Sequence, residues 1–132
     1  MHRIAAPLRT TVLVVDDDAV FRSLLREVLT AEGCQVVCAE NGAAALEILG
    51  SITPDLILTD LSMPVMSGWD LLAQLETDPR LANVPTTVLS AMSGESAGHG
   101  HTVLHKPLDL SNLLGLLEAV ALAQPDGHRT PQ

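Results

Sequence analysis

Short apolar runs in this 132-residue sequence are followed by polar side chains that could do chemistry together. Three of these side chains are carboxylates, one is a hydroxyl and one is an amine: Asp16, Asp17, Asp60, Ser90 and Lys106. Three carboxylates brought close together repel one another, and they favour a hard divalent cation with oxygen ligands, most naturally Mg²⁺. The residue types therefore predict an acidic metal site with a hydroxyl and an ammonium beside it.

Phosphoryl transfer is the chemistry that such a set of groups suits. The charge on a transferring phosphoryl group lies on its equatorial oxygens, so catalysis is mainly positioning and charge neutralisation. A metal would neutralise one side of the group, Lys106 supplies a cation on the other, and the Ser90 hydroxyl can donate a hydrogen bond. Asp60 would be the nucleophile and would form an aspartyl phosphate.

The elements that must position these residues alternate between strands and helices. Apolar and β-branched runs predict five strands, over residues 11–15, 34–39, 56–58, 84–90 and 102–104. Helical patterns predict four helices, over residues 19–32, 42–50, 67–78 and 108–123. This alternation predicts a doubly wound parallel sheet, an α/β fold in which the carboxyl ends of the strands meet at one edge and form a crevice.

The apolar patterns also predict which helix faces are buried. In the first helix we expect an apolar stripe of two neighbouring rows: Val20, Leu24 and Val28 with Phe21, Leu25 and Leu29. In the third helix we expect Leu71, Leu72 and Leu75 to point inward.

The interval between the fourth and fifth strands departs from the alternation. Residues 91–101 contain three glycines and no apolar stripe, and a parallel crossover usually needs a dozen or more residues. We therefore expect a loop or a single loose turn there, so that the fourth helix of the fold is short or missing. The folded domain is expected over residues 11–123, after a lead-in at 1–10 and before a tail or linker at 124–132.

Composition limits the classes of partner and the location. The formal net charge of −9 argues against nucleic-acid binding, which needs a basic face to neutralise the phosphates. No apolar stretch is long enough to span a bilayer, and residues 1–10 lack the apolar core of a signal peptide. These two features predict a cytoplasmic protein. Cys34 and Cys38 lie too far apart along one predicted strand for a disulfide, so we expect reduced core thiols.

Four motifs at the strand ends give residues 11–123 a resemblance to a known family. The motifs are Val-Val-Asp16-Asp17, Asp60-x-x-Met63-Pro64-x-Met66-x-Gly68, Ser90-Ala91 and Lys106-Pro107. The chain resembles the receiver (REC) domain of bacterial two-component response regulators. This resemblance implies a flavodoxin-like five-stranded parallel sheet of order 2-1-3-4-5 with five helices.

The resemblance also implies a phosphorelay function. Asp60 would accept a phosphoryl group from a histidine kinase, and the altered conformation would signal to a protein partner or an output domain outside this chain. It assigns the ligands of Mg²⁺ as Asp16, Asp17, Asp60 and the backbone carbonyl of Ser62, with Lys106 and Ser90 on the phosphoryl oxygens. The chain would be a phosphoprotein that assists its own phosphorylation and dephosphorylation, and not an enzyme, with no nucleic acid and no membrane among its partners.

Two departures from the family pattern concern signal relay rather than phosphoryl chemistry. Family members often carry an aromatic residue three positions before the lysine, and its inward swing accompanies the movement of the hydroxyl. Here that position is Val103, so the switch pair would be Ser90 and Val103. The second departure is the segment 91–101, because the fourth helix is usually part of the output and dimerisation face.

Three other interpretations fit parts of the pattern. Asp16 and Asp17 could cap the first helix, as acids at a helix start often do. The chain could be a receiver-like protein–protein binding module that phosphorylation does not switch. Finally, residues 16–20 fit the Asp-x-Asp-x-Val signature of haloacid-dehalogenase-like phosphatases, in which Asp16 would be the nucleophile.

Overall fold

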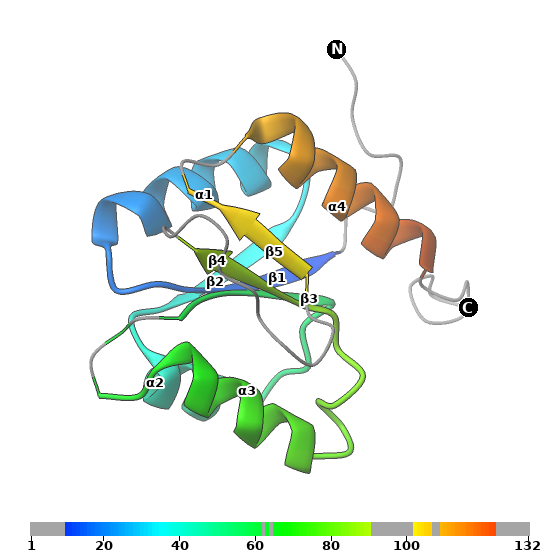
Figure 1. Ribbon diagram of the computed structural model, residues 1–132. Coiled ribbons are helices and arrows are strands. Elements are labelled where there is room, and N and C mark those ends of the chain that lie inside the picture. The colour runs from blue at the N-terminus through cyan, green and yellow to red at the C-terminus, as the bar shows by residue number, and fades with distance from the viewer. Residues whose placement is uncertain (1–9, 62, 64, 91–101, 107–108, 124–132) are drawn as a thin grey trace.

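A parallel sheet of five strands forms the centre of the computed structural model, which describes residues 10–61, 63, 65–90, 102–106 and 109–123 (Figure 1). The strand order is β2-β1-β3-β4-β5. The strands are β1 (Thr11–Val15), β2 (Gln35–Ala39), β3 (Leu56–Asp60), β4 (Thr86–Ser90) and β5 (Thr102–His105). This order confirms the doubly wound sheet that the sequence predicts.

Four helices in the described part of the chain cover the sheet. They are α1 (Ala19–Ala31), α2 (Gly42–Leu49), α3 (Gly68–Thr77) and α4 (Leu110–Ala123). Figure 1 shows α1 and α4 on one face of the sheet and α2 and α3 on the other. The connection at 91–101 lies outside the described residues, and with it the expected short or missing fourth helix; the expected terminal segments lie outside too, apart from Thr10.

The central strands β1 and β3 are buried on both faces, which explains why they are almost continuously apolar. Successive side chains of β1 point to opposite faces of the sheet, as in any pleated strand. Val12 and Val14 belong to the core cluster beneath α1 and α4. Leu13 and Val15 belong to the cluster beneath α2 and α3, which also contains the three predicted inward leucines of α3. The sheet, packed on both faces, therefore supports the residues at its carboxyl edge.

The first helix buries a narrower stripe than expected. The residues that face the sheet, fully or in part, are Phe21, Leu25, Val28 and Leu29. Val20 and Leu24 are instead 79% and 54% exposed, so the prediction that they face the core is wrong. Neighbouring residues of a helix point about 100° apart. When Phe21, Leu25 and Leu29 face the sheet, Val20 and Leu24 therefore point toward solvent, and only Val28 of their row stays partly buried.

Two further expectations concern the thiols and the membrane. Cys34 and Cys38 are both free thiols, and Cys34 is buried, as expected for reduced core cysteines. Within the described ranges, we find no helix that combines the length and the apolar character needed to cross a bilayer.

Candidate functional site

The register of the sheet brings the predicted site residues to one edge. β1 and β3 pair through Val15 and Thr59, so the two acids that directly follow these residues lie side by side. β4 and β5 pair through Ser90 and His105. Lys106, the residue after His105, therefore lies one position beyond the level of Ser90. Segments far apart in the sequence thus meet at the carboxyl edge of the sheet, where α/β folds place ligands.

Asp16, Asp17 and Asp60 form an acidic cluster at this edge. Each offers a carboxylate oxygen, and these oxygens all lie within 4.8 Å of one another. Asp16 is fully buried, Asp60 is partly buried and Asp17 is exposed. The three carboxylates range from buried to exposed. They suit a site for a hard divalent cation that is open to solvent on one side. Ser62, expected to add a backbone carbonyl, lies outside the described residues.

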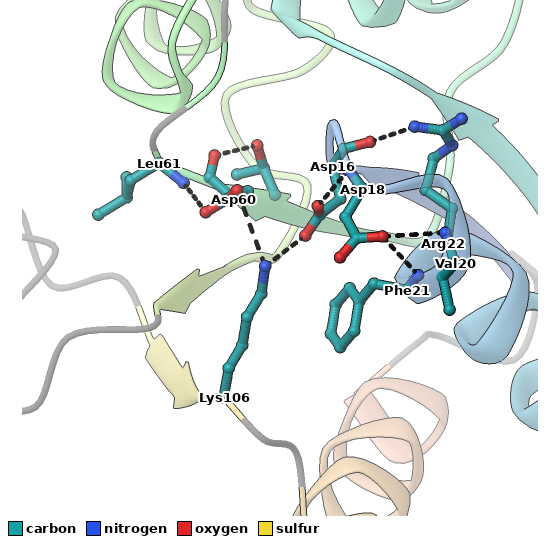
Figure 2. A network of polar contacts seen from close by, with 9 residues as sticks. Asp16, Asp18, Val20, Phe21, Arg22, Asp60, Leu61 and Lys106 are labelled. Atoms are coloured by element: carbon teal, nitrogen blue, oxygen red, sulfur yellow. Dashed lines mark hydrogen bonds and ion pairs between the residues drawn. The ribbon is translucent and has the colours of Figure 1, made fainter.

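Lys106 reaches two of the three acids. Its Nζ is 2.7 Å from Asp16 Oδ2 and 3.7 Å from Asp60 Oδ2 (Figure 2). The buried Asp16 carboxylate needs a partner because desolvation of an unpaired charge is unfavourable. The ammonium meets that need and remains within reach of a group attached to Asp60.

Asp18 is the N-cap of α1. Its Oδ1 accepts the backbone N–H groups of Val20, at 2.9 Å, and Phe21, at 3.2 Å. The Asp18 N–H in turn donates to Asp16 Oδ1 at 2.9 Å. The capping interpretation therefore applies to Asp18 and not to Asp16 or Asp17.

Gly68, the last residue of the Asp60 motif, lies against the backbone of the strand end. Its N–H donates to the carbonyl oxygen of Leu61 at 2.9 Å. A β-carbon added at Gly68 would lie 2.1 Å from the carbonyl oxygen of Asp60 and 2.8 Å from Leu61 Cα. Only glycine permits this approach, which anchors the start of α3 to the residue that carries the carboxylate.

The substitution Gly68→Ala is expected to lower the free energy of unfolding by about 2–4 kcal/mol, because two backbone segments must separate. Urea denaturation measures this change. Gly115→Ala on α4 is the matched control, since a β-carbon there meets nothing within 4 Å and alanine favours a helix. Equal unfolding free energies for the two variants would contradict the close contact at Gly68.

The loop beyond Asp60 is also tied to α2. The Gly42 N–H donates to the carbonyl oxygen of Met66 at 3.1 Å. A β-carbon on Gly42 would lie 2.7 Å from Met66 Cγ. Val65 has a φ of 69°, which β-branched residues rarely adopt. The loop therefore holds backbone strain next to the acidic cluster, as functional sites often do.

The two predicted switch residues are described to different extents. Val103 pairs with Val88 in the sheet and packs, partly buried, against the core cluster beneath α2 and α3. Ser90 ends β4 at the expected edge, but its side chain is outside the described part of the structure. The role of the Ser90 hydroxyl therefore stays a prediction.

Two site residues were not expected from the sequence. The Arg22 Nη1 donates to the carbonyl oxygen of Asp16 at 2.6 Å. The centroid of the Phe21 ring lies 4.4 Å from Lys106 Nζ. Both lie in the first turn of α1, which begins just after the acids, and this placement indicates proximity, but Phe21 fits an apolar core stripe equally well.

Comparison with known proteins gives consistent matches. Residues 12–118 match the family described as response regulator receiver domain. The two-component response regulator ARR17 of Arabidopsis thaliana is 34% identical over 120 residues, which cover 77% of this chain and 78% of that protein. The chemotaxis response regulator CheY4 of Vibrio cholerae has a similar structure, with a TM-score of 0.77, 26% identity and coverage of 85% of this chain and 98% of that chain.

Several of the relatives are much longer than this chain, which covers less than a quarter of their length. The sensor histidine kinase TmoS of Ectopseudomonas mendocina is 43% identical over 84 residues, which cover 64% of this chain and 8% of that protein. The similarity to this kinase is therefore limited to a small part of its length.

Proposed function

Because this chain belongs to the response regulator receiver domain family, which the match over residues 12–118 establishes, we propose that Asp60 is its phosphoryl-accepting residue. Domains of this family are phosphoacceptor signalling modules, and not catalysts of a metabolic reaction. The observation that carries the choice of Asp60 is its environment. Its carboxylate belongs to the three-acid cluster, and the ammonium of Lys106 lies 3.7 Å away.

Receiver domains typically bind Mg²⁺ at an acidic pocket, and this chain has a fitting donor set. We assign the ion to the carboxylates of Asp16, Asp17 and Asp60 and to the backbone carbonyl of Ser62. When bound, Mg²⁺ supplies positive charge to the phosphoryl oxygens. The buried Asp16 is held by Lys106 and by the Asp18 N–H, so one wall of the site is formed in advance.

The remaining steps belong to side chains of the chain itself. An Asp60 carboxylate oxygen attacks the phosphorus atom, and the bond from phosphorus to the donor breaks with its electron pair leaving on the donor. The product is an acyl phosphate on Asp60. Lys106 and the Ser90 hydroxyl then bind the phosphoryl oxygens. Ser90 is the last residue of β4 and Lys106 directly follows β5, at the sheet edge that carries Asp60.

Receiver domains interact with histidine kinases, and we propose a phosphohistidine of such a kinase as the natural donor. The receiver domain would span residues 11–123 and would signal to a downstream protein or output domain outside this chain. Two free cysteines support a reducing compartment, and we propose the cytoplasm. The acidic charge supports a protein partner rather than nucleic acid.

Two alternatives from the sequence are treated differently. The phosphatase interpretation is set aside, because the family consists of signalling modules and because Asp18, which its signature needs, caps α1. The binding module without a phosphorylation switch shares the fold and needs an experiment.

Incubation of the chain with acetyl phosphate and Mg²⁺ tests the proposal. We expect the intact mass to increase by one phosphoryl group, and we expect neutral hydroxylamine to remove it, because acyl phosphates react with this nucleophile. Chelation of Mg²⁺ is expected to prevent the gain. A chain that gains no phosphoryl group under these conditions would be the unswitched binding module.

A further inference from the structure

The ammonium of Lys106 rests on an aromatic ring. The centroid of the Phe21 ring lies 4.4 Å from Nζ (Figure 2), well within the range of a cation–π interaction. The Lys106 side chain is 21% exposed, so the ring contributes to its shielding from solvent. Such contacts are stronger when water is partly excluded.

The ring itself is held in place from two sides. The Phe21 N–H donates to the N-cap carboxylate of Asp18, which fixes the first turn of α1 beside Asp16. The Phe21 side chain is partly buried against the core cluster beneath α1 and α4. The ring is therefore an anchored surface, whereas a lysine side chain has four flexible carbons.

We propose that Phe21 is a positioning residue for Lys106: its ring restrains the ammonium between Asp16 and Asp60 and so raises the rate of phosphoryl uptake. The three contacts of the ammonium, at 2.7 Å to Asp16, 3.7 Å to Asp60 and 4.4 Å to the ring, leave it few other positions. This inference rests on the proposed function of Asp60. Phe21, a residue of the apolar stripe, would thus position the ammonium of Lys106 in addition to the acids.

The composition of the chain permits an unusually clean test. Phe21 is the single phenylalanine and Lys106 the single lysine of the sequence. Biosynthetic incorporation of mono-, di- and trifluorophenylalanine therefore changes residue 21 alone, and each fluorine weakens the negative ring face with little change in shape. We expect the rate of phosphorylation by acetyl phosphate to fall stepwise, by about three- to tenfold in total. We expect Mg²⁺ affinity and the unfolding midpoint to stay nearly constant.

A side-chain ¹⁵N label in lysine reports on the Lys106 ammonium alone, and its NMR signal is expected to move with each added fluorine. Phe21→Leu should lower the rate of phosphorylation by acetyl phosphate. Phe21→Trp should keep most of the wild-type rate, because it retains an aromatic face. Val28→Ala removes partly buried apolar atoms from the same helix, so it should lower stability without slowing phosphorylation.

The outcomes separate this inference from the proposed function. An unmodified chain that takes up phosphoryl on Asp60, with a rate that fluorination leaves unchanged, overturns the role of Phe21 alone. A rate that falls only in proportion to lost stability, as in Val28→Ala, overturns it as well. An unmodified chain that takes up no phosphoryl group overturns both proposals. The acetyl phosphate test shows this result before any fluorinated residue is introduced.

Discussion

Asp60→Asn is expected to abolish phosphoryl uptake from acetyl phosphate, to a rate about a hundredfold or more below that of the wild type. An amide is a far weaker nucleophile than a carboxylate, so no acyl phosphate can form at this position. The fold should survive, because the substitution removes one of three mutually repelling charges and Lys106 keeps its 2.7 Å contact with Asp16. Intact mass measured over time, together with a thermal unfolding curve, tests both expectations.

Asp55→Asn is the matched control, because this aspartate directly precedes the same strand at its opposite end. The Asp55 carboxylate accepts the Thr11 N–H at 2.8 Å, and asparagine keeps an oxygen for that bond. We expect this variant to take up phosphoryl at the wild-type rate. Persistent uptake in Asp60→Asn would move the acceptor elsewhere and disprove the assignment.

Lys106→Met is expected to change two quantities in opposite directions. The rate of phosphoryl uptake should fall by about 10²–10³, the usual effect of removing one preorganised donor to developing charge. The affinity for Mg²⁺ should rise, by about tenfold, because the ammonium no longer neutralises Asp16 and Asp60. Titration of Mg²⁺ followed by the fluorescence of Trp69, the single tryptophan, measures the second change.

The stability of this variant should depend on the metal. Removal of the ammonium leaves the fully buried Asp16 without its cation, which should lower the free energy of unfolding by about 1–3 kcal/mol. Added Mg²⁺ should restore stability, since a ligand that binds the native state stabilises it. Lys106→Arg, which keeps the charge, is the control and should show wild-type Mg²⁺ affinity. A Lys106→Met variant with weaker Mg²⁺ binding would contradict the competition between the two cations.

The order of strands and helices was largely predictable because hydrophobic periodicity reports the period of each element. The predicted boundaries differ from the observed ones by a few residues where local chemistry intervenes. β4 begins at Thr86 rather than at residue 84, because Val84 still bonds back to Leu81 and Pro85 has no N–H to donate. The stripe of α1 was predicted too wide, because two apolar rows fit the helical period and only packing decides which of their residues are buried.

By itself, the sequence determined that Asp16, Asp60 and Lys106 meet at one edge, because parallel strands present their carboxyl ends together. Only the tertiary structure decided that Lys106 pairs more closely with Asp16 than with Asp60, across 90 residues of sequence. It also decided that the Phe21 ring lies beside the ammonium and that Gly68 touches the backbone of Asp60. The physical reason is that periodicity encodes the direction in which a side chain points. The distance between two side chains depends instead on how helices and loops from remote segments pack against the sheet.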